Sequence, residues 1–454
     1  MRLPTNDVLA ALGGTLVNRD RLPGTIAIST DTRAIRPSET FLALRGERFD
    51  GHAFVAAAAA NGASAAIVDD ASALPEGLAG IVVADTLAAY LTLGALARAR
   101  LHGTVVAISG STGKTTTKTF LRQAFEAAGR PAAATPENEN NEIGVAKFLL
   151  GLDDGDPRIA IVEMGARKYG DLAPLVAAAR PDIAVLTNVG DAHLEIVGGR
   201  ERLAGTKWGL FATGAQAVLG LADATSRERA PELARPPLWF GIDAERPDGD
   251  ARAVVVRHDD VLAIDAGAVR ALPLLVDVPG DHNRRNLAAA LAAAWAAGVD
   301  PGAVTAAAPH FALPGGRYER VRTPGGPDVI YDAYNASMSG ALATLAAFAR
   351  ERAGRRIAVL GSMAELGPEA PEMHERVGAA AAAAADVVLV GGDHASSLAA
   401  GALGAGIAPA ALVTYASNGE AIAWLRAHAR AGDLVLLKGS RMYRMEQIVA
   451  GLRA

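Results

Sequence analysis

The stretch VVAISGSTGKTTTK, from Val105 to Lys118, decides the fold of this chain. A β-branched apolar run leads into a glycine-rich turn and then into a helical segment, which is the setting of a phosphate-binding loop. Backbone N–H groups of residues 110–113 and the helix N-terminus would hold phosphate oxygens. Lys114 would reach the terminal phosphates, and Thr115 would offer its hydroxyl to Mg²⁺. The sequence therefore predicts a nucleotide site, although Ile108 stands where the common G-x-x-x-x-G-K-[ST] form has its first glycine.

Length and composition limit the class of protein. At 454 residues the chain exceeds the size at which one hydrophobic core keeps growing, so two or three domains are expected. The net charge is only -5, which gives no electrostatic reason to expect a nucleic acid or an anionic membrane as partner. The chain contains no cysteine, which excludes disulfides and thiol nucleophiles and suits a reducing compartment. Pro4 and Asp7 interrupt the segment where an export signal would need an apolar core, so we expect a cytoplasmic protein without membrane insertion.

Short β-branched runs alternate with helical stretches rich in Ala and Leu along most of the chain. This alternation is typical of parallel sheets covered by helices, and it predicts an α/β protein. We expect three domains: a small α/β N-terminal domain over residues 1–84, a central P-loop parallel-sheet domain over 85–313, and a C-terminal Rossmann-like domain over 314–454.

Polar side chains stand at the ends of two later apolar strands. Glu163 closes the run IAIVE, where it is either a Mg²⁺ ligand or a glutamate that points to solvent. The next strand is followed by Asn188, Asp191, His193 and Glu195. Two such clusters in one sheet indicate a shared site at its carboxyl edge, where α/β sheets bind ligands. Lys207 lies in an apolar helical pattern and, taken alone, is best explained by a long side chain whose ammonium reaches water.

Seven segments together carry a family resemblance. They are GSTGKTTTK, TPENENNEIGVA, EMGA, TNVGDAHLE, PGDHNRRNLAAALAAA, GGRYER and YDAYNAS. In this order they resemble the Mur ligases, and the resemblance runs from about Thr30 to Arg441, nearly the whole chain. It is strongest to the branch that joins D-alanyl-D-alanine to UDP-N-acetylmuramoyl-tripeptide in peptidoglycan synthesis. The loop of this family lacks the first glycine, so Ile108 is ordinary in it.

The resemblance implies a site for ATP and Mg²⁺. The catalytic residues would be Lys114, Lys207, His193 and Arg317. The metal ligands would be Thr115, Glu163, His193 and Lys207, with a carbamate on Lys207. The residues implied for ATP binding are Gly110, Ser111, Thr112, Gly113, Lys114, Thr115, Thr116, Asn283, Asn286, Arg317, Asp332 and Asn335.

The resemblance also implies contacts with two further substrates. The UDP sugar would be held by Thr30, Asp31, Arg33, Arg45, Gly46, Asp50, Gly51 and His52. The peptide carboxylate would approach Asn140, Asn141 and Glu142, and the dipeptide would lie near His374, Lys438, Ser440 and Arg441. The chain departs from the family pattern at Gly209, at Ser362 and in the ASM that follows Asn335, where the family usually has an acid, an Asp and Asn-Pro.

The reaction of this family suits these residues. ATP would convert a carboxylate into an acyl phosphate, and an amine would then attack it through a tetrahedral state. Both steps build negative charge, which Lys114, Mg²⁺ and Arg317 can offset through fixed electrostatics. We expect the enzyme to act as a monomer.

Two other functions stay open at this point. A ligase of the same fold could add a single amino acid or a glutamate chain to another acceptor, although NNEIG, AHLE and YDAYNA favour the dipeptide branch. A P-loop NTPase that acts as a switch or a transport component makes no bond. It would not need a first domain for a UDP sugar, or an Arg and Asp pair on a separate third domain.

Overall fold

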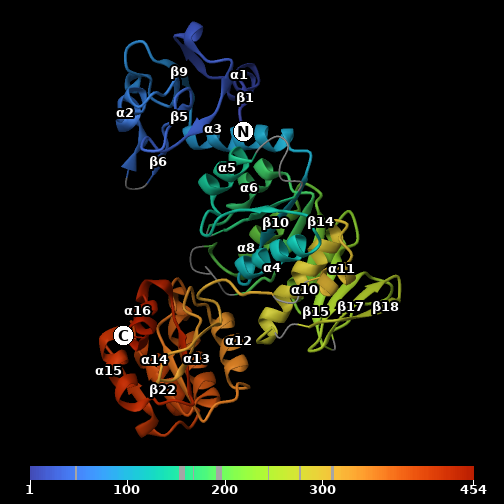
Figure 1. Cartoon of the computed structure of the whole chain (residues 1–454), viewed down its shortest axis with the longest axis vertical. Coiled ribbons are helices and arrows are strands. Elements are labelled where there is room, and N and C mark those ends of the chain that lie inside the picture. The colour runs from blue at the N-terminus through green and yellow to red at the C-terminus, as the bar shows by residue number, and fades with distance from the viewer. Residues whose placement is uncertain are drawn as a thin grey trace.

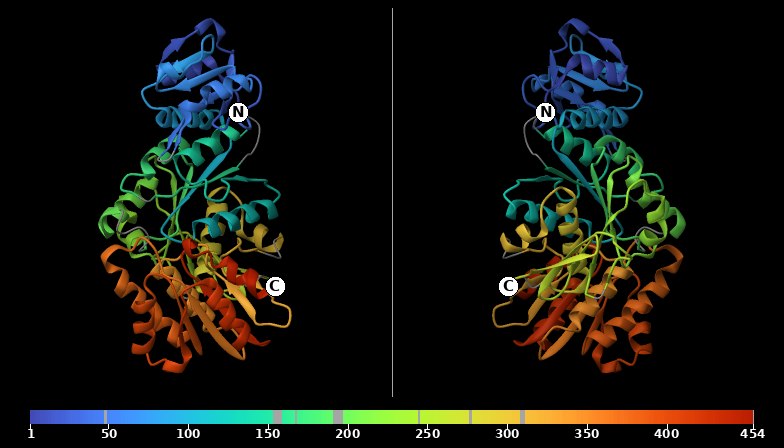
Figure 2. Two further views of the ribbon diagram at one scale, coloured as in Figure 1. Left: turned by 90° about the vertical axis from the view of Figure 1, so that its left-hand side faces the viewer. Right: turned by 90° about the vertical axis from the view of Figure 1, so that its right-hand side faces the viewer.

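The computed structural model describes residues 1–46, 49–152, 159–166, 168–190, 197–243, 245–275, 278–307 and 311–453. Three large sheets follow one another along the long axis of the molecule, with the two chain ends in different outer domains (Figure 1). Views turned to either side show the same succession (Figure 2). The predicted three-domain α/β architecture is confirmed. Among the described residues, no helix is long and apolar enough to cross a membrane.

The N-terminal sheet has the strand order β2-β9-β8-β5-β4. The strands are β2 (Thr15–Val17), β4 (Ile28–Ser29), β5 (Thr40–Leu42), β8 (Ala65–Val68) and β9 (Ala79–Val82). The domain also contains the helices α1 (Thr5–Leu12) and α2 (Val55–Ala60). Two short strand pairs complete it: β1 (Leu3–Pro4) pairs with β3 (Thr25–Ile26), and β6 (Arg45–Gly46) pairs with β7 (Phe49–Asp50). Only β2 runs antiparallel to its neighbour in the sheet. Alternate residues face opposite sides, so Phe41 packs in one cluster with α2 while Leu42 packs in another with α1.

The central sheet has the strand order β11-β12-β10-β13-β14-β15-β16-β17-β18. The strands are β10 (Thr104–Ser109), β11 (Ala133–Ala134), β12 (Ile159–Glu163), β13 (Ile183–Leu186), β14 (Gln216–Gly220), β15 (Leu238–Ile242), β16 (Ala253–Val256), β17 (Asp260–Asp265) and β18 (Ala268–Pro273). The first seven strands of this order are parallel, as predicted. The last two add an antiparallel extension, so the prediction of a parallel sheet is wrong for this end.

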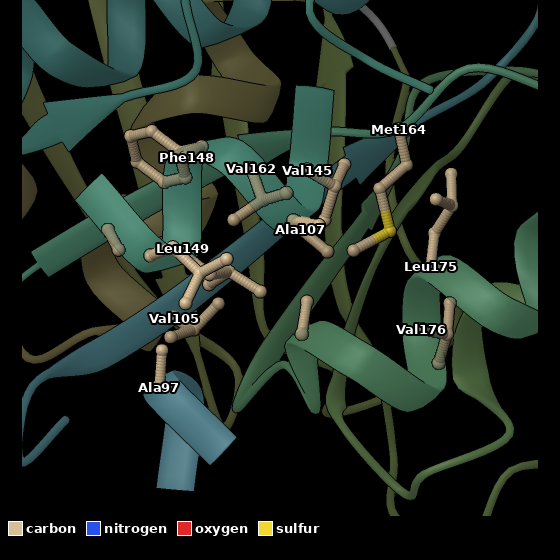
Figure 3. Close-up of a cluster of buried hydrophobic side chains, with 14 of the residues drawn as sticks. Ala97, Val105, Ala107, Val145, Phe148, Leu149, Val162, Met164, Leu175 and Val176 are labelled. Carbon is tan, nitrogen blue, oxygen red and sulfur yellow. The ribbon is translucent and has the colours of Figure 1, made fainter. Parts of the chain in front are cut away.

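Helices cover the two faces of the central sheet. They are α3 (Thr86–Arg100), α4 (Lys114–Ala127), α5 (Glu142–Gly151), α6 (Leu172–Ala179), α8 (Arg200–Trp208), α9 (Ala224–Arg229), α10 (Asp281–Ala296) and α11 (Pro301–Ala307). Val105 and Ala107 of β10 point toward α3, α5 and α6 (Figure 3). Val106 and Ile108 pack instead with α4 and α10. The phosphate-loop strand is thus buried on both faces, which explains its unbroken apolar run.

The C-terminal sheet has the strand order β19-β20-β24-β21-β22-β23. The strands are β19 (Glu319–Val321), β20 (Asp328–Tyr331), β21 (Arg355–Leu360), β22 (Val387–Val390), β23 (Leu412–Thr414) and β24 (Asp433–Lys438), and the helices are α12 (Met338–Phe348), α13 (Ala370–Ala384), α14 (Ala395–Gly404), α15 (Asn418–His428) and α16 (Glu446–Arg453). All neighbours are parallel except β19 and β20. Helices α12, α13 and α14 cover one face, and α15 and α16 cover the other.

Register fixes where the functional segments meet. Ile108 of β10 pairs with Glu163 of β12, and Ser109 pairs with Leu186 of β13. The phosphate loop, Glu163 and the residues after Leu186 therefore leave the sheet at the same carboxyl edge.

Candidate active site

A cavity of about 1000 Å³ lies at this edge, lined by residues of the central and C-terminal domains. It brings together seventeen of the residues predicted from sequence. These are Ser111, Thr112, Gly113, Lys114, Thr115, Thr116, Asn140, Asn141, Glu142, Glu163, Asn188, Asn283, Asn286, Arg317, Asp332, Asn335 and Lys438. Segments that are separated by more than two hundred positions in the sequence thus line the same cavity.

The phosphate loop needs its two glycines at residues 110 and 113. Both have positive φ, 145° for Gly110 and 82° for Gly113. A Cβ on Gly110 would lie 1.9 Å from Thr187 Oγ1, and one on Gly113 would lie 2.2 Å from Asn286 Oδ1. No side chain fits at either position, so the loop backbone packs directly against β13 and α10.

Lys114 begins α4, and its ammonium curls back over the loop. Nζ donates to the carbonyl oxygens of Gly110 at 2.8 Å and Ser111 at 3.3 Å. Burial lowers the pKa of Lys114; the Glu163 carboxylate opposes this effect and Arg317 adds to it. The ammonium and the helix N-terminus together make this end of the cavity attractive to phosphate.

Glu163 is the centre of a buried polar cluster. Its side chain points inward and the residue is only 3% exposed, so the interpretation of a solvent-facing glutamate is wrong. Oε1 accepts hydrogen bonds from Thr115 Oγ1 at 3.1 Å and Asn140 Nδ2 at 3.0 Å. Oε2 lies 3.0 Å from Lys118 Nζ. Burial alone would raise the pKa of this carboxyl, but Lys118, Lys114 and the Asn140 hydrogen bond hold it below its ordinary value.

Lys207 lies on α8 and is 1% exposed. The alternative of an ammonium that reaches water is therefore wrong. Burial lowers the pKa of Lys207 to about 7; Lys114 adds to this effect and Asp171 opposes it. Asp171 and Lys114 line the cavity, whereas Lys207 does not. The other predicted member of this group, His193, lies outside the described residues.

Arg317 and Asp332 enter the cavity from the C-terminal domain. The Arg317 guanidinium lies 3.9 Å from the centre of the Tyr334 ring, which makes a close cation–π contact. The Tyr334 hydroxyl donates to Asn138 Oδ1 of the central domain. Asp332 accepts from Lys438 Nζ at 2.9 Å and from the Thr344 hydroxyl. Lys438 also donates to the Asn335 carbonyl at 3.1 Å.

The two predicted asparagines of α10 form the wall opposite these residues. Asn286 Nδ2 donates to Asn283 Oδ1 at 3.4 Å, and Asn283 Nδ2 donates to the Pro279 carbonyl at 3.0 Å. His282 lines the same cavity, and burial lowers its pKa to about 4. Sequence reasoning missed His282, although it sits in the quoted PGDHN segment. An imidazole kept neutral here can offer a hydrogen bond without adding charge.

The predicted UDP-sugar residues lie in the N-terminal domain and outside the cavity. Arg45 is held by Asp69 at 2.8 Å and also pairs with Asp50. The His52 ring contacts Asp50 Oδ1 through Nδ1 at 2.7 Å and accepts from the Asp69 N–H through Nε2 at 3.0 Å. Gly51 lies against Leu44, where a Cβ would meet backbone at 2.7 Å. The side chains of Arg45, Asp50 and His52 and residue Asp69 thus form one connected cluster, in which sequence reasoning missed Asp69.

The rest of the predicted N-terminal set is more exposed. Asp31 accepts from the Arg33 guanidinium at 2.7 Å, next to Thr30, and the two charged side chains are 44% and 88% exposed. Gly46 of β6 pairs with Phe49 of the antiparallel strand β7. An ion pair this exposed adds little to stability, which leaves Arg33 able to turn toward an anionic ligand.

Three predicted dipeptide residues, and Gly110, do not line the cavity. His374 is fully buried: its Nε2 accepts from the Met363 N–H at 2.8 Å and its Nδ1 contacts the Ala370 carbonyl at 2.6 Å. Both ring nitrogens are occupied by backbone, so this structure gives His374 a packing role and does not support its placement at the dipeptide. Ser440 is also buried, with its N–H bonded to the Ser362 carbonyl. Arg441 lies 5.1 Å from the centre of the Tyr334 ring, which Arg317 also contacts.

Three family models match successive parts of the chain. They describe a Mur ligase family catalytic domain at residues 26–99, a Mur ligase middle domain at 108–294, and a Mur ligase glutamate ligase domain at 316–441. The UDP-N-acetylmuramoyl-tripeptide–D-alanyl-D-alanine ligase of Synechocystis is 35% identical over 94% of this chain and 92% of its own. The Escherichia coli enzyme of the same name is 32% identical over 94% of this chain and 93% of its own.

Solved structures give the same result. A crystal structure of MurF from Acinetobacter baumannii has a TM-score of 0.85 at 28% identity, and covers 100% of this chain and 99% of that chain. The MurF ligase of Thermotoga maritima in complex with ADP has a TM-score of 0.78 at 29% identity, with 94% and 96% covered. The similarity therefore extends over all three domains.

Proposed function

The chain belongs to the Mur ligase family, and from this we propose that it uses ATP to join D-alanyl-D-alanine to UDP-N-acetylmuramoyl-tripeptide. The observation that carries the proposal is the composition of the cavity. One volume holds a phosphate loop, the acceptor segment of residues 140–142, and Arg317 and Asp332 of a separate domain. A ligase needs ATP, an acceptor and an amine to meet in one place, whereas a switch needs only the nucleotide.

The terminal phosphates of ATP would bind over the loop. Lys114 would exchange its bonds to the Gly110 and Ser111 carbonyls for bonds to phosphate, which requires only rotation of its side chain. Arg317 would face the same phosphates from the other domain, fixed by the Tyr334 ring. These cations offset the charge that develops as the acceptor carboxylate becomes an acyl phosphate and as the amine of the dipeptide attacks it.

Thr115 and Glu163 fit the first Mg²⁺ of such a site. Both present oxygen atoms, the ligand type that Mg²⁺ prefers, at the wall of the cavity. The described residues contain no group of three His, Asp or Glu side chains arranged for a metal, so phosphate and water would supply the remaining ligands. Bound Mg²⁺ would neutralise charge on the phosphate oxygens.

Lys207 fits the carbamate that the family resemblance implies. Only the neutral amine adds CO₂, and burial that lowers the pKa to about 7 makes a large fraction neutral at physiological pH. A carbamate would turn this buried cation into an anion beside the cationic Lys114. We propose that the carbamate on Lys207, together with His193, is a further ligand of Mg²⁺.

The acceptor would extend from the N-terminal domain to the cavity. The Arg45, Asp50 and His52 loop would hold the UDP sugar, and Asn140 to Glu142 would receive the peptide carboxylate. Helix α5 begins at Glu142 and packs on α3, which connects the two domains. The dipeptide would enter from the side of Lys438 and Arg441. Because the substrates are ATP and a nucleotide-linked precursor, we place the reaction in the cytoplasm, and we expect a monomer to complete it.

Phosphate release tests the proposal. Purified protein should release phosphate from ATP only when UDP-N-acetylmuramoyl-tripeptide and D-alanyl-D-alanine are both present, and Lys114→Ala protein should release none. A panel of single amino acids, glutamate included, tests the alternative of another ligase of this fold. Release with a single amino acid and not with the dipeptide would favour that alternative, and release without any acceptor would favour a switch.

A further inference from the structure

Lys118 is a buried cation that the proposed reaction does not use. It lies on α4, one turn after Lys114, and is 5% exposed. Its Nζ donates to the Thr135 carbonyl at 2.8 Å and lies 3.0 Å from Glu163 Oε2. Thr135 in turn accepts the Glu163 N–H through its hydroxyl at 3.0 Å. Thr135 thus holds the backbone of Glu163, and Lys118, which is bonded to Thr135, holds its side chain.

The two oxygens of Glu163 face different surroundings. Oε1 is bonded to Thr115 and Asn140, which both line the cavity. Oε2 is fully buried and faces Lys118, which does not line the cavity. The ammonium therefore approaches the carboxylate from the protein interior, and a ligand in the cavity can reach Oε1 without displacing it.

We propose that Lys118 is the internal counter-ion of Glu163, and that it keeps the site closed to a free divalent cation until a nucleotide arrives. The inference rests on the proposal that Thr115 and Glu163 hold Mg²⁺. Lys118 pairs with the Glu163 carboxylate, so this carboxylate offsets Lys114 and Arg317, which line the same cavity, less than an unpaired one would. A lone cation is repelled, whereas a cation that enters with a polyphosphate brings its own negative charge. Lys118 is in this sense a positioning residue, because it acts on the metal only through Glu163.

Binding of Mn²⁺ to nucleotide-free protein tests the proposal, with the free ion followed by electron paramagnetic resonance. Lys118→Met keeps the length of the side chain and removes its charge. It should bind Mn²⁺ about tenfold or more tightly than wild-type protein, because Glu163 loses its counter-ion. Lys118→Arg keeps the charge and should bind as weakly as wild type. An equal or weaker Mn²⁺ affinity in Lys118→Met would overturn the proposal.

A double variant keeps the test decisive if Lys118→Met folds poorly. Removing both charges in Lys118→Met, Glu163→Gln should recover the fold and bind no Mn²⁺ without nucleotide. A double variant as unstable as Lys118→Met would show that Lys118 acts by packing, and would overturn the proposal. Mn²⁺ binding in the presence of ATP to Glu163→Gln alone tests the metal site separately. If that binding is unchanged, the assignment of Glu163 fails, independently of what Lys118 does.

Discussion

Lys118 on α4 and Lys207 on α8 are both almost fully buried close to the phosphate loop, but their surroundings differ. The Lys118 ammonium lies against the Glu163 carboxylate and a backbone carbonyl. For Lys207, burial and the neighbouring Lys114 outweigh the opposing charge of Asp171, so the pKa falls to about 7. The two lysines therefore differ in their charged neighbours: the Glu163 carboxylate contacts Lys118, whereas Asp171 does not offset the burial of Lys207.

Because their surroundings differ, the two lysines suit different chemical roles. A paired ammonium is unreactive, and it can serve as a fixed charge. A lysine that is partly neutral at pH 7 is a nucleophile toward CO₂. The central domain thus holds one lysine in an ion pair with Glu163 and another whose amine can be modified.

The largest effect should come from replacing Lys207. Lys207→Ala should lose about 10³-fold in turnover, since the proposed carbamate ligand of the metal is removed. Acetate or formate at high concentration should restore part of the activity by standing in for the carbamate. Lys147→Ala is the matched control, because Lys147 forms a surface ion pair with Glu139 and should have little effect. Near-normal turnover in Lys207→Ala would contradict the carbamate, and lack of rescue would leave high-resolution density at Lys207 to decide it.

A second effect concerns stability and pH. The folded state lowers the Lys207 pKa from 10.5 to about 7, so between these values the unfolded chain binds a proton that the folded protein does not. Unfolding free energy should then rise with pH through this window by up to about 1.4 kcal/mol per pH unit, and fall as pH drops toward 7. Lys207→Met has no titrating group at this position, so its free energy of unfolding should exceed that of wild type near pH 7. This difference in unfolding free energy should disappear toward pH 10.

Urea unfolding in CO₂-depleted buffer measures this difference. Lys118→Met is the contrasting control, and it should be less stable than wild type because Glu163 loses its ion-pair partner. A constant gap between wild type and Lys207→Met from pH 7 to 10 would argue that Lys207 keeps its proton in the folded state. The proposed difference between Lys118 and Lys207 would then be wrong.

The contrast also shows what the sequence could predict. The phosphate loop and Glu163 were found because short-range rules fix them: glycines with positive φ follow a buried strand, and parallel strands end at one edge. Lys118 was missed, although it lies four residues after Lys114 and three after Thr115 and so shares their helix face. Because Lys118 ends the polar run TTTK, the local sequence pattern is that of a lysine on an exposed helix face. Only the packing of β11 and β12 against α4 buries it.

Other features of the molecule depend on long-range packing in the same way. His374 is predicted at the dipeptide because it belongs to a family segment, but whether an α13 side chain faces a ligand or the Met363 backbone depends on tertiary contacts. The Tyr334 contact with Asn138 joins positions 196 residues apart, and no local pattern indicates it. The antiparallel direction of β17 and β18 was not predicted, because strand-like sequence alone does not give the direction in which an edge strand pairs.

The smallest effect should come from replacing Asp171, whose charge acts on Lys207. Asp171 lines the cavity, and its charge raises the Lys207 pKa against burial. Asp171→Asn keeps an oxygen that can accept from the Lys168 N–H and removes the charge. The Lys207 pKa should then fall further, so that more of the amine is neutral and more carbamate forms at pH 7. Carbon-13 NMR of protein in labelled bicarbonate measures the pH at which half of the carbamate forms. Asp7→Asn is the control, because Asp7 pairs with Arg100 at the surface and should leave the midpoint unchanged. A midpoint in Asp171→Asn that stays in place or moves to higher pH would show that Asp171 does not set the charge of Lys207.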